Sequence, residues 1–246
     1  MFATSPVWGV GLASERKLFG LGIETAGDLA RVDARLARNL LSVVGERTVL
    51  ELQGISCLPL EDVPPQRKGC AVTRSFGAPV TDLAGMLEAV AAYAMRAGEK
   101  LRRHGLEATH MAVFMHTSRF NQKDKPHSAQ TTVHFPEASN DTFDLIRAAQ
   151  CGARKIFRDG HRYAKAGIIM NDLVRAASQP RPLFDARDRD QSERLMTALD
   201  AVNGKFGRGS LIPASAGIKR DWQAKFDRRS PRYTTNIKEL PVALAR

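Results

Sequence analysis

The chain has 246 residues, a length that fits one large domain or two to three small ones. Its 37 Lys and Arg residues outnumber 26 Asp and Glu residues, which gives a formal net charge of +11. A charge of this size favours an anionic partner, with nucleic acid ahead of a membrane surface. The sequence contains no apolar run long enough to span a bilayer and no signal-peptide pattern at its start. We therefore expect a protein without a membrane segment.

The cysteines and histidines do not suggest a metal site. Cys57, Cys70 and Cys151 are far apart, odd in number and form no CxxC pair. This usage fits the reducing cytoplasm and argues against a disulfide framework or a cysteine-based zinc site. His110 and His116 share strand parity, but no further ligands accompany them. We expect no bound metal in this chain.

The first motif is VWGVG at residues 7–11. Its two glycines allow a tight turn whose backbone N–H groups approach a phosphate without reading a base. Gly9, Val10 and Gly11 are the candidate donors, and Trp8 is expected to anchor the turn in the core.

Short helices are expected next, with Thr25 and Asp33 as N-caps and Gly54 after the last helix. A glycine turn at residues 20–23 joins the first two, which is typical of a helix-hairpin-helix, a sequence-independent grip on a nucleic-acid backbone. The alternative is a small helical bundle with glycine C-caps. The expected helices span residues 14–21, 25–32, 33–41 and 43–52.

A proline-containing tether at residues 59–68 leads into a mixed block at residues 69–175. Asp82 and either Asn140 or Asp141 are expected to cap two amphipathic helices. The order of elements is βαββαβ, which predicts an α+β fold with a four-stranded antiparallel sheet, both helices on one face and the other face free. The strands are expected at residues 70–76, 109–117, 130–135 and 162–173.

The remaining sequence divides into a linker at residues 176–191 and a small, mostly helical domain at residues 192–246. Helices are expected at residues 192–206 and around residues 222–226. Within the second part, the candidate surface residues are Trp222, Arg232 and Tyr233.

Charge is distributed unevenly along the chain. Residues 1–65 carry 6 basic and 8 acidic side chains, a net charge of −2. Residues 66–175 carry 17 and 10, a net charge of +7, and residues 176–246 carry 14 and 8, a net charge of +6. The basic surface is therefore expected to begin after the helical N-terminal part.

This order of domains resembles the thumb and little finger of Y-family translesion DNA polymerases. Its sequence motifs resemble those of the UmuC-type branch. The resemblance covers the chain from about residue 6 to its end. It implies a helix-hairpin-helix thumb at residues 1–58, a little finger at 69–175 and a UmuC-type C-terminal domain at 192–246. The motifs that carry it are VWGVG, GIETAGDLA, ERTVLEL, RSFG, EKLR, TSRF, HRYAKAG, LMTALDAVN, FGRGSL and SPRYTT.

The resemblance also implies where DNA is held. Candidate residues fall on strands or strand ends where the family's sheet meets the duplex backbone, and their clustering on one open face favours phosphate contact over simple solvation. These residues are Arg74, Ser75, Thr117, Ser118, Arg119, Arg162 and Lys165.

Further partners are implied by the resemblance alone. Gln179, Leu183 and Phe184 resemble the short peptide that docks on the beta sliding clamp, although two prolines intervene. The alternative is a linker whose apolar pair packs on its own domain. The C-terminal domain would contact a UmuD-type subunit and RecA.

Catalysis is expected elsewhere. The family's catalytic carboxylates lie in a palm domain before the hairpin and hold Mg²⁺, and this sequence begins at the thumb. We therefore expect no catalytic residue, no cofactor and no enzyme activity from this chain alone. The leading hypothesis is sequence-independent binding of DNA, including damaged DNA, in SOS repair and mutagenesis. The alternatives are a split polymerase completed by a separate palm and fingers, and a clamp or RecA interaction module.

Overall fold

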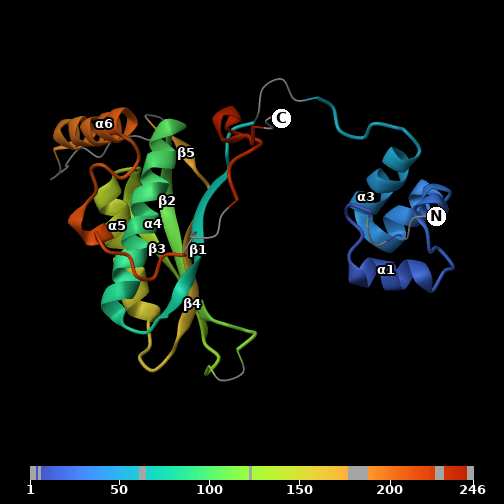
Figure 1. Cartoon of the computed structure of the whole chain (residues 1–246), viewed down its shortest axis with the longest axis horizontal. Coiled ribbons are helices and arrows are strands. Elements are labelled where there is room, and N and C mark those ends of the chain that lie inside the picture. The colour runs from blue at the N-terminus through green and yellow to red at the C-terminus, as the bar shows by residue number, and fades with distance from the viewer. Residues whose placement is uncertain are drawn as a thin grey trace. The chain divides into compact units, whose positions relative to one another are not determined.

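The computed structural model describes residues 4, 7–60, 65–121, 124–176, 188–224 and 230–242. The chain divides into two compact units, Met1–Pro65 and Gln66–Arg246. Figure 1 labels their helices and strands. Each unit has a hydrophobic core of its own.

The first unit contains α1 (Leu12–Phe19), α2 (Ala26–Ala30) and α3 (Ala34–Leu52). The turn between α1 and α2 depends on Gly22, whose φ of 73° is in the left-handed region that glycine adopts without strain. The Ile23 N–H donates to the Leu18 carbonyl across this turn at 3.0 Å. The two short helices joined by a glycine turn are thus confirmed.

Both predicted N-caps of this unit are confirmed. The Asp28 N–H donates to the Thr25 hydroxyl at 3.1 Å, and the Thr25 N–H donates to the Asp28 carboxylate at 3.0 Å, which completes a capping box. Hydrogen bonds from Thr25, followed by one from Arg31, lower the pKa of Asp28 to about 2. The Asp33 carboxylate accepts from the first N–H groups of α3.

Helix α3 joins the two helices predicted on either side of residue 42. Ser42 has φ 78° and ψ −175°, so the helix is kinked there. This backbone region is almost restricted to glycine, and a serine in it costs about 1–3 kcal/mol. The unit holds this kink over a small core of buried residues, which comprises Val10, Leu18, Leu29, Ala37 and Val49.

Trp8 does not anchor the N-terminal turn, and that prediction was wrong. Its side chain is 94% exposed, whereas Val10 is buried. The cause is Gly9, whose φ of 89° turns the chain so that Val10 enters the core. The Gly9 backbone lies against Val44 and Thr48 of α3.

The second unit is built on an antiparallel sheet with strand order β1-β4-β2-β3. The α+β fold and its βαββαβ order are confirmed. A fifth strand, β5 (Val174–Arg175), pairs with the start of β2; two residues are too few to show a periodicity in the sequence. The other elements are β1 (Gly69–Val80), α4 (Leu83–Arg103), β2 (Leu106–Thr117), β3 (Ser128–Ser139), α5 (Thr142–Ile156) and β4 (Tyr163–Asn171).

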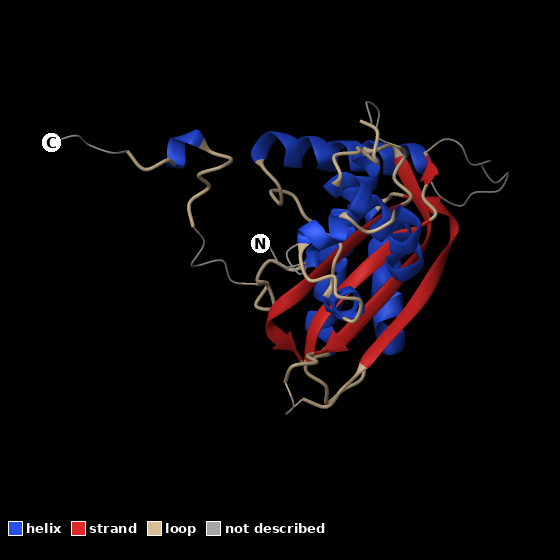
Figure 2. Cartoon of the chain, turned by 90° about the vertical axis from the view of Figure 1, so that its right-hand side faces the viewer, coloured by secondary structure: helices blue, strands red, loops and turns tan. Residues whose placement is uncertain are grey.

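Helices α4 and α5 cover one face of this sheet, as Figure 2 shows from the side of the strands. Asp82 caps α4 and Asp141, rather than Asn140, caps α5. Gly152 of α5 allows close approach, because a Cβ there would lie 2.8 Å from a methyl group of Val113 on β2. The largest fully buried side chains of this core include Tyr163, Met86, Leu101, Met111, Met115, Leu145, Ile168 and Met170.

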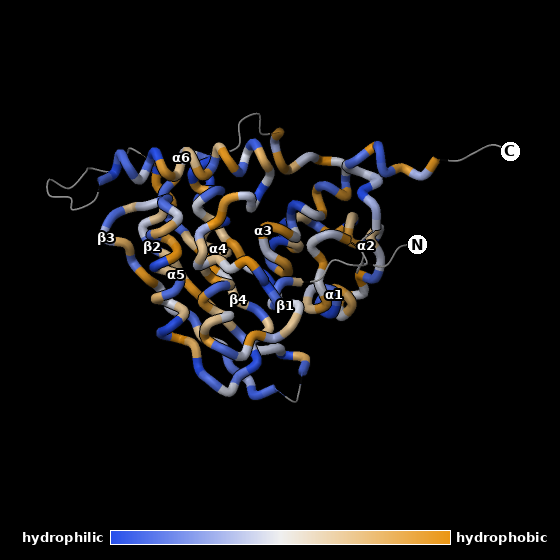
Figure 3. The backbone as a smooth tube through the Cα atoms, turned by 60° about the vertical axis from the view of Figure 1, so that its left-hand side comes forward, coloured by the Kyte–Doolittle hydropathy of each residue, from blue (hydrophilic) through white to orange (hydrophobic). Residues whose placement is uncertain are grey.

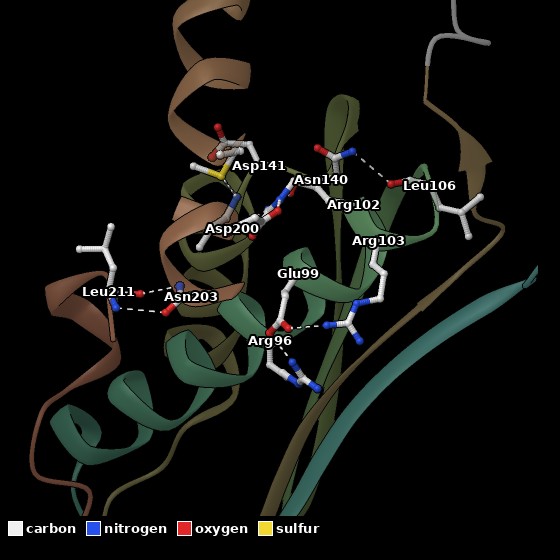
Figure 4. A network of polar contacts seen from close by, with 12 residues as sticks. Arg96, Glu99, Arg102, Arg103, Leu106, Asn140, Asp141, Asp200, Asn203 and Leu211 are labelled. Atoms are coloured by element: carbon white, nitrogen blue, oxygen red, sulfur yellow. Dashed lines mark hydrogen bonds and ion pairs between the residues drawn. The ribbon is translucent and has the colours of Figure 1, made fainter. Parts of the chain in front are cut away.

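Helix α6 (Arg189–Phe206) packs at the ends of α4 and α5. Arg102 donates to both carboxylate oxygens of Asp200, each at 2.7 Å, and also to the Asn140 carbonyl at 2.7 Å (Figure 4). The Thr142 N–H donates to the Met196 sulfur at 3.3 Å. Arg102 also donates to the Thr142 hydroxyl of α5 at 3.0 Å, so its guanidinium joins α4, α5 and α6.

Residues 213–224 extend along α4 to the edge of β1. The 3-10 helix η1 (Ala214–Ala216) packs on α4. The Trp222 ring meets Phe76 and Tyr93 edge-on, and its Nε1 donates to Glu88 at 2.8 Å. Trp222 is therefore a packing residue, and its prediction as a surface marker was wrong.

The short helix predicted at residues 222–226 was also wrong for the part that the structure describes. Residues 221–223 form a turn and a bend, and residues 225–229 lie outside the described ranges. In place of a helix, the turn at residues 221–223 directs the Trp222 side chain towards the core formed by β1 and α4. A second 3-10 helix, η2 (Ile237–Glu239), follows, and its Glu239 pairs with Arg232.

Candidate nucleic-acid interface

The face of the sheet opposite α4 and α5 is not covered by a helix of the second unit (Figure 2). Strand alternation and register place one set of side chains on it. We call this set the open face. Its members are Ala71, Thr73 and Ser75 of β1, Lys165, Gly167 and Ile169 of β4, His110, Ala112, Phe114 and His116 of β2, and Ser128, Gln130, Thr132 and His134 of β3.

The open face is polar and carries no carboxylate at any of these described positions. Its ionisable groups are the ammonium of Lys165 and the imidazoles of His110, His116 and His134. Hydroxyl and amide groups fill much of the remainder. Such a surface can bind an anion or a polar backbone, since no fixed negative charge repels it.

The centre of the open face is aromatic. A Cβ at Gly167 would lie 2.8 Å from the Phe114 ring and 2.6 Å from a Thr73 methyl group, so the ring lies across β4 at this glycine. The Phe114 and His116 rings are stacked, with centroids 6.3 Å apart and an interplanar angle of 15°. This strip presents aromatic rings to a ligand.

One end of the sheet carries additional positive charge. It lies where β2 connects to β3 and where β4 begins. Arg162 lies 3.3 Å from Asp124 in an ion pair. The neighbouring cationic side chains of the described residues here are Arg119, Lys125 and Arg158.

Two histidines connect the two segments at this end. The His127 and His161 rings have centroids 4.7 Å apart, and His127 Nδ1 lies 3.2 Å from the Tyr163 hydroxyl. Burial lowers the pKa of His127, and the charges of His161 and Arg158 lower it further. The contact holds the loop end against the start of β4.

The predicted DNA-contact residues of this unit lie in three places: on the open face, on the helix side of the sheet, and at the end of the sheet where β2 connects to β3. Ser75 and Lys165 are cross-strand partners on the open face. Arg74, next in sequence, pairs with Ala166 and alternates to the helix side, where its charge acts on Tyr93. Thr117 is 4% exposed.

The other residues of the set lie at the loop end. The Thr117 hydroxyl accepts the His127 N–H at 3.0 Å and so fixes the base of the loop. The Ser118 hydroxyl accepts from the Phe120 N–H at 3.2 Å, which shapes the loop that carries Arg119. Arg162 lies just before β4. DNA contact by all of these residues stays a prediction.

The N-terminal turn uses one of its three candidate donors internally. The Val10 N–H donates to the Val7 carbonyl at 3.0 Å. Gly11 is the N-cap of α1, where no side chain caps the helix. Phosphate contact by Gly9 and Gly11 stays a prediction.

Gln179, Leu183 and Phe184, the predicted clamp-binding residues, lie outside the described residues. Among the described residues, no group of three or more His, Cys, Asp or Glu side chains could hold a metal ion. In the same part of the chain, no helix combines the length and the apolar character needed to cross a membrane.

Sequence reasoning missed Phe114, His134 and the pairing of His134 with His110. The alternation of apolar and polar residues in β3 is a usable signal for the face of His134. In β2, residues 111–115 are all apolar, so the sequence does not indicate which face Phe114 is on. The pairing depends on the strand register, which contains a bulge between Ala108 and His110. No local pattern in the sequence gives that bulge.

Comparisons with known proteins match both the sheet-containing part and the C-terminal part of the chain. Residues 67–183 match the impB/mucB/samB family C-terminal domain, and residues 193–243 match a domain of unknown function (DUF4113). By this match, residues 67–183 resemble the C-terminal domain of that family. The resemblance of this domain and its flanking segments to the C-terminal half of UmuC-type proteins is thereby confirmed.

Relatives of this domain extend the match to almost the whole chain. It is 40% identical over 238 residues to protein SamB and 40% identical over 235 residues to protein UmuC, both of Salmonella typhimurium. These alignments cover 96% and 95% of this chain but 56% of each relative, so the chain spans about half the length of the curated relatives it matches. DNA polymerase IV of Pelotomaculum thermopropionicum is 24% identical over 225 residues, which are 87% of this chain and 53% of that protein.

Proposed function

We propose that this chain binds DNA without reading its sequence, as the DNA-holding portion of a translesion polymerase in SOS repair and mutagenesis. Its family domain and its similarity to UmuC and to a protein named DNA polymerase IV support this proposal. The polymerase activity of such relatives belongs to proteins of about twice the matched length, and we assign no catalytic step to this chain.

The observation that carries the proposal is the open face. No helix of the second unit covers it, it is free of carboxylates at its described positions, and it has aromatic rings at its centre and cationic side chains at one end. Sequence-independent binding needs contacts to phosphate and sugar rather than to base edges, and hydroxyl, amide and cationic groups supply such contacts.

The predicted domains are proposed to contribute unequally to DNA binding. Residues 69–175, the little finger, supply most of the attraction, because residues 66–175 carry a net charge of +7 from 17 basic and 10 acidic side chains. The thumb at residues 1–58 adds a weaker contact through Gly9 and Gly11, since residues 1–65 carry a net charge of −2 from 6 basic and 8 acidic side chains. No structural observation assigns a ligand to residues 192–246.

The test is a fluorescence anisotropy titration of the full chain with primer–template DNA of several sequences at a series of salt concentrations. Affinity is expected to vary little with sequence and to fall with salt, by roughly 0.7–0.9 log units per log unit of salt for each phosphate contacted. Lys165→Gln should reduce that slope by about one contact.

The matched control is Lys155→Gln, which removes the same charge from the exposed end of α5, away from the open face. It should leave the slope unchanged. Absent binding, or binding that does not depend on salt, contradicts the proposal.

A second function is favoured by the surface of the first unit: completion of a polymerase by a second polypeptide. Trp8 is 94% exposed, Leu12 74% and Val44 53%. The Gly9 backbone, next to Trp8, lies against Val44, which brings two of these side chains to one region. Figure 3 shows hydrophobic segments recurring along α3. Exposed apolar groups of this kind are typical of a surface that contacts another polypeptide.

The partner would be a polypeptide equivalent to the part of UmuC that this chain does not match. Mixing the two with primer–template DNA, nucleotides and Mg²⁺ should give primer extension that neither part gives alone. Trp8→Ser combined with Leu12→Ser should abolish extension while leaving DNA binding by the second unit intact. No complex and no extension in any mixture would reject this function.

A further inference from the structure

We propose that His110, His116 and His134 bind DNA phosphates in their protonated form, so that DNA binding by this chain takes up protons. The inference rests on the proposed function, because it assigns residues and a proton linkage to the same open face. It gives these three histidines a ligand, the phosphate group of DNA.

The three imidazoles share one face although they come from two strands. His110 on β2 and His134 on β3 are direct cross-strand partners, and their ring centroids are 5.6 Å apart. His116, farther along β2, has Ser128 and Lys165 as its cross-strand partners. Half of the six histidines of the chain are therefore on the open face.

The charges around this face favour an external anion as the partner of a protonated imidazole. On the face itself the other ionisable group is Lys165, which is also cationic. At the His110 end, the nearby carboxylates are those of Glu107 and Glu137. Both line a cavity of about 1100 Å³ together with residues of α6, and Glu137 forms an ion pair with Arg189.

At the other end, the nearby carboxylate of Asp124 pairs with Arg162. Helices α4 and α5 contribute nothing to the open face, because they pack on the opposite side of the sheet. Among the described residues, no carboxylate forms an ion pair with these three imidazoles, so a ligand can supply their counter-ion. DNA phosphates supply it.

Hydrogen bonding of His116 explains why the protonated ring is the binding form. Its Nδ1 lies 3.0 Å from the Thr117 carbonyl oxygen. A carbonyl oxygen only accepts, so Nδ1 carries the hydrogen, and Nε2 of the neutral ring is a bare acceptor. An acceptor repels a phosphate oxygen. Protonation converts Nε2 into a charged donor, which makes a strong hydrogen bond to phosphate.

The spacing of the histidines suits an extended anion. His116 is six residue steps after His110 along β2, which is roughly 20 Å at the usual rise of a strand. A DNA duplex presents several phosphates over that length. One small anion could occupy one end of the face only, whereas a DNA backbone can contact all three imidazoles.

The experiment measures the affinity of the full chain for primer–template DNA at about pH 6 and about pH 8, which bracket the usual titration range of imidazole. Affinity should rise on acidification, by up to about tenfold per pH unit for each proton taken up. The triple variant His110→Gln, His116→Gln, His134→Gln should lose most of that rise.

His104→Gln is the matched control, because His104 is the C-cap of α4 and is not on the open face. It should keep the full pH dependence. Calorimetry in two buffers of different ionisation enthalpy counts the protons taken up directly. The single variant His134→Gln, at an exposed position, should lower that number even if the triple variant folds poorly.

Equal pH dependence in the triple variant and the unmodified chain would overturn the inference, and so would proton uptake that is zero in the unmodified chain. Both results leave DNA binding itself intact. Failure to bind DNA at either pH would instead reject the proposed function, and the histidine assignment with it.

Discussion

The two compact units treat their apolar side chains differently. Among the described residues, the first unit buries five apolar side chains in its core, and the second buries 24. The first leaves Trp8 and Leu12 largely in solvent, while the second covers its helices with α6 and residues 213–224. The second unit thus builds the larger core, although it too leaves some apolar side chains in solvent, among them Phe120, Ile218 and Ile237. The first has the composition of a domain that packs against something else.

The largest expected effect comes from the core of the second unit. Ile168→Ala removes a side chain that is fully buried between the sheet and its helices, and it should cost about 2–5 kcal/mol of unfolding free energy. Hydrogen exchange measured peptide by peptide should speed up in α4 and β2 but not in α1 to α3. Val44→Ala, at an exposed site, is the control and should change stability by less than about 0.5 kcal/mol. Equal acceleration in both units would show that they unfold together.

A smaller effect of opposite sign is expected in the first unit. Ser42→Gly should stabilise it by roughly 1 kcal/mol, because glycine adopts the backbone angles of the α3 kink without the strain that serine carries. Chemical denaturation measures the change. The same substitution at Ser14, inside α1, should destabilise the unit, since glycine is a poor helix former. Destabilisation by Ser42→Gly would show that the kink is not strained.

The smallest expected effect is an acid sensitivity of the α2 cap. The pKa of Asp28 is lowered from 3.8 to about 2, so its ionised form stabilises the folded unit above that range, and the contribution is lost as the pH falls from 3.8 towards 2. Circular dichroism of the thermal transition over this range should show it. Thr25→Ala removes the main cause of the lowered pKa and should reduce the acid sensitivity attributable to Asp28. An unchanged profile in that variant would contradict the assignment.

Much of the second unit could be predicted because its signals are local. The apolar stripe of α4 and the Asp82 and Asp141 caps are set by residues within one or two turns, and each was found. The free sheet face followed from the order of strands and helices. For the same reason Ser75 and Lys165 could be expected on strands, although their pairing could not.

The errors concern choices that local sequence does not decide. Trp8 and Val10 are both apolar, and the φ of Gly9 determines which of them enters the core. Trp222 is half-buried against Phe76 and Tyr93, which lie more than 120 residues earlier in the chain. Arg74 faces the helices because its register with Ala166 sets its parity. Each outcome depends on a distant partner.

The strand order also bears on how this protein avoids self-association. The outer strands of the main four-strand array, β1 and β3, contain Pro79 and Pro136, whereas the inner strands β2 and β4 contain no proline. Proline cannot donate a backbone hydrogen bond, so each outer strand is a poor template for a strand from another molecule. The Gly77 N–H of β1 is in addition donated to the Trp222 carbonyl at 2.9 Å. The C-terminal segment thereby occupies part of an edge from which intermolecular β-sheet, and hence aggregation, would otherwise start.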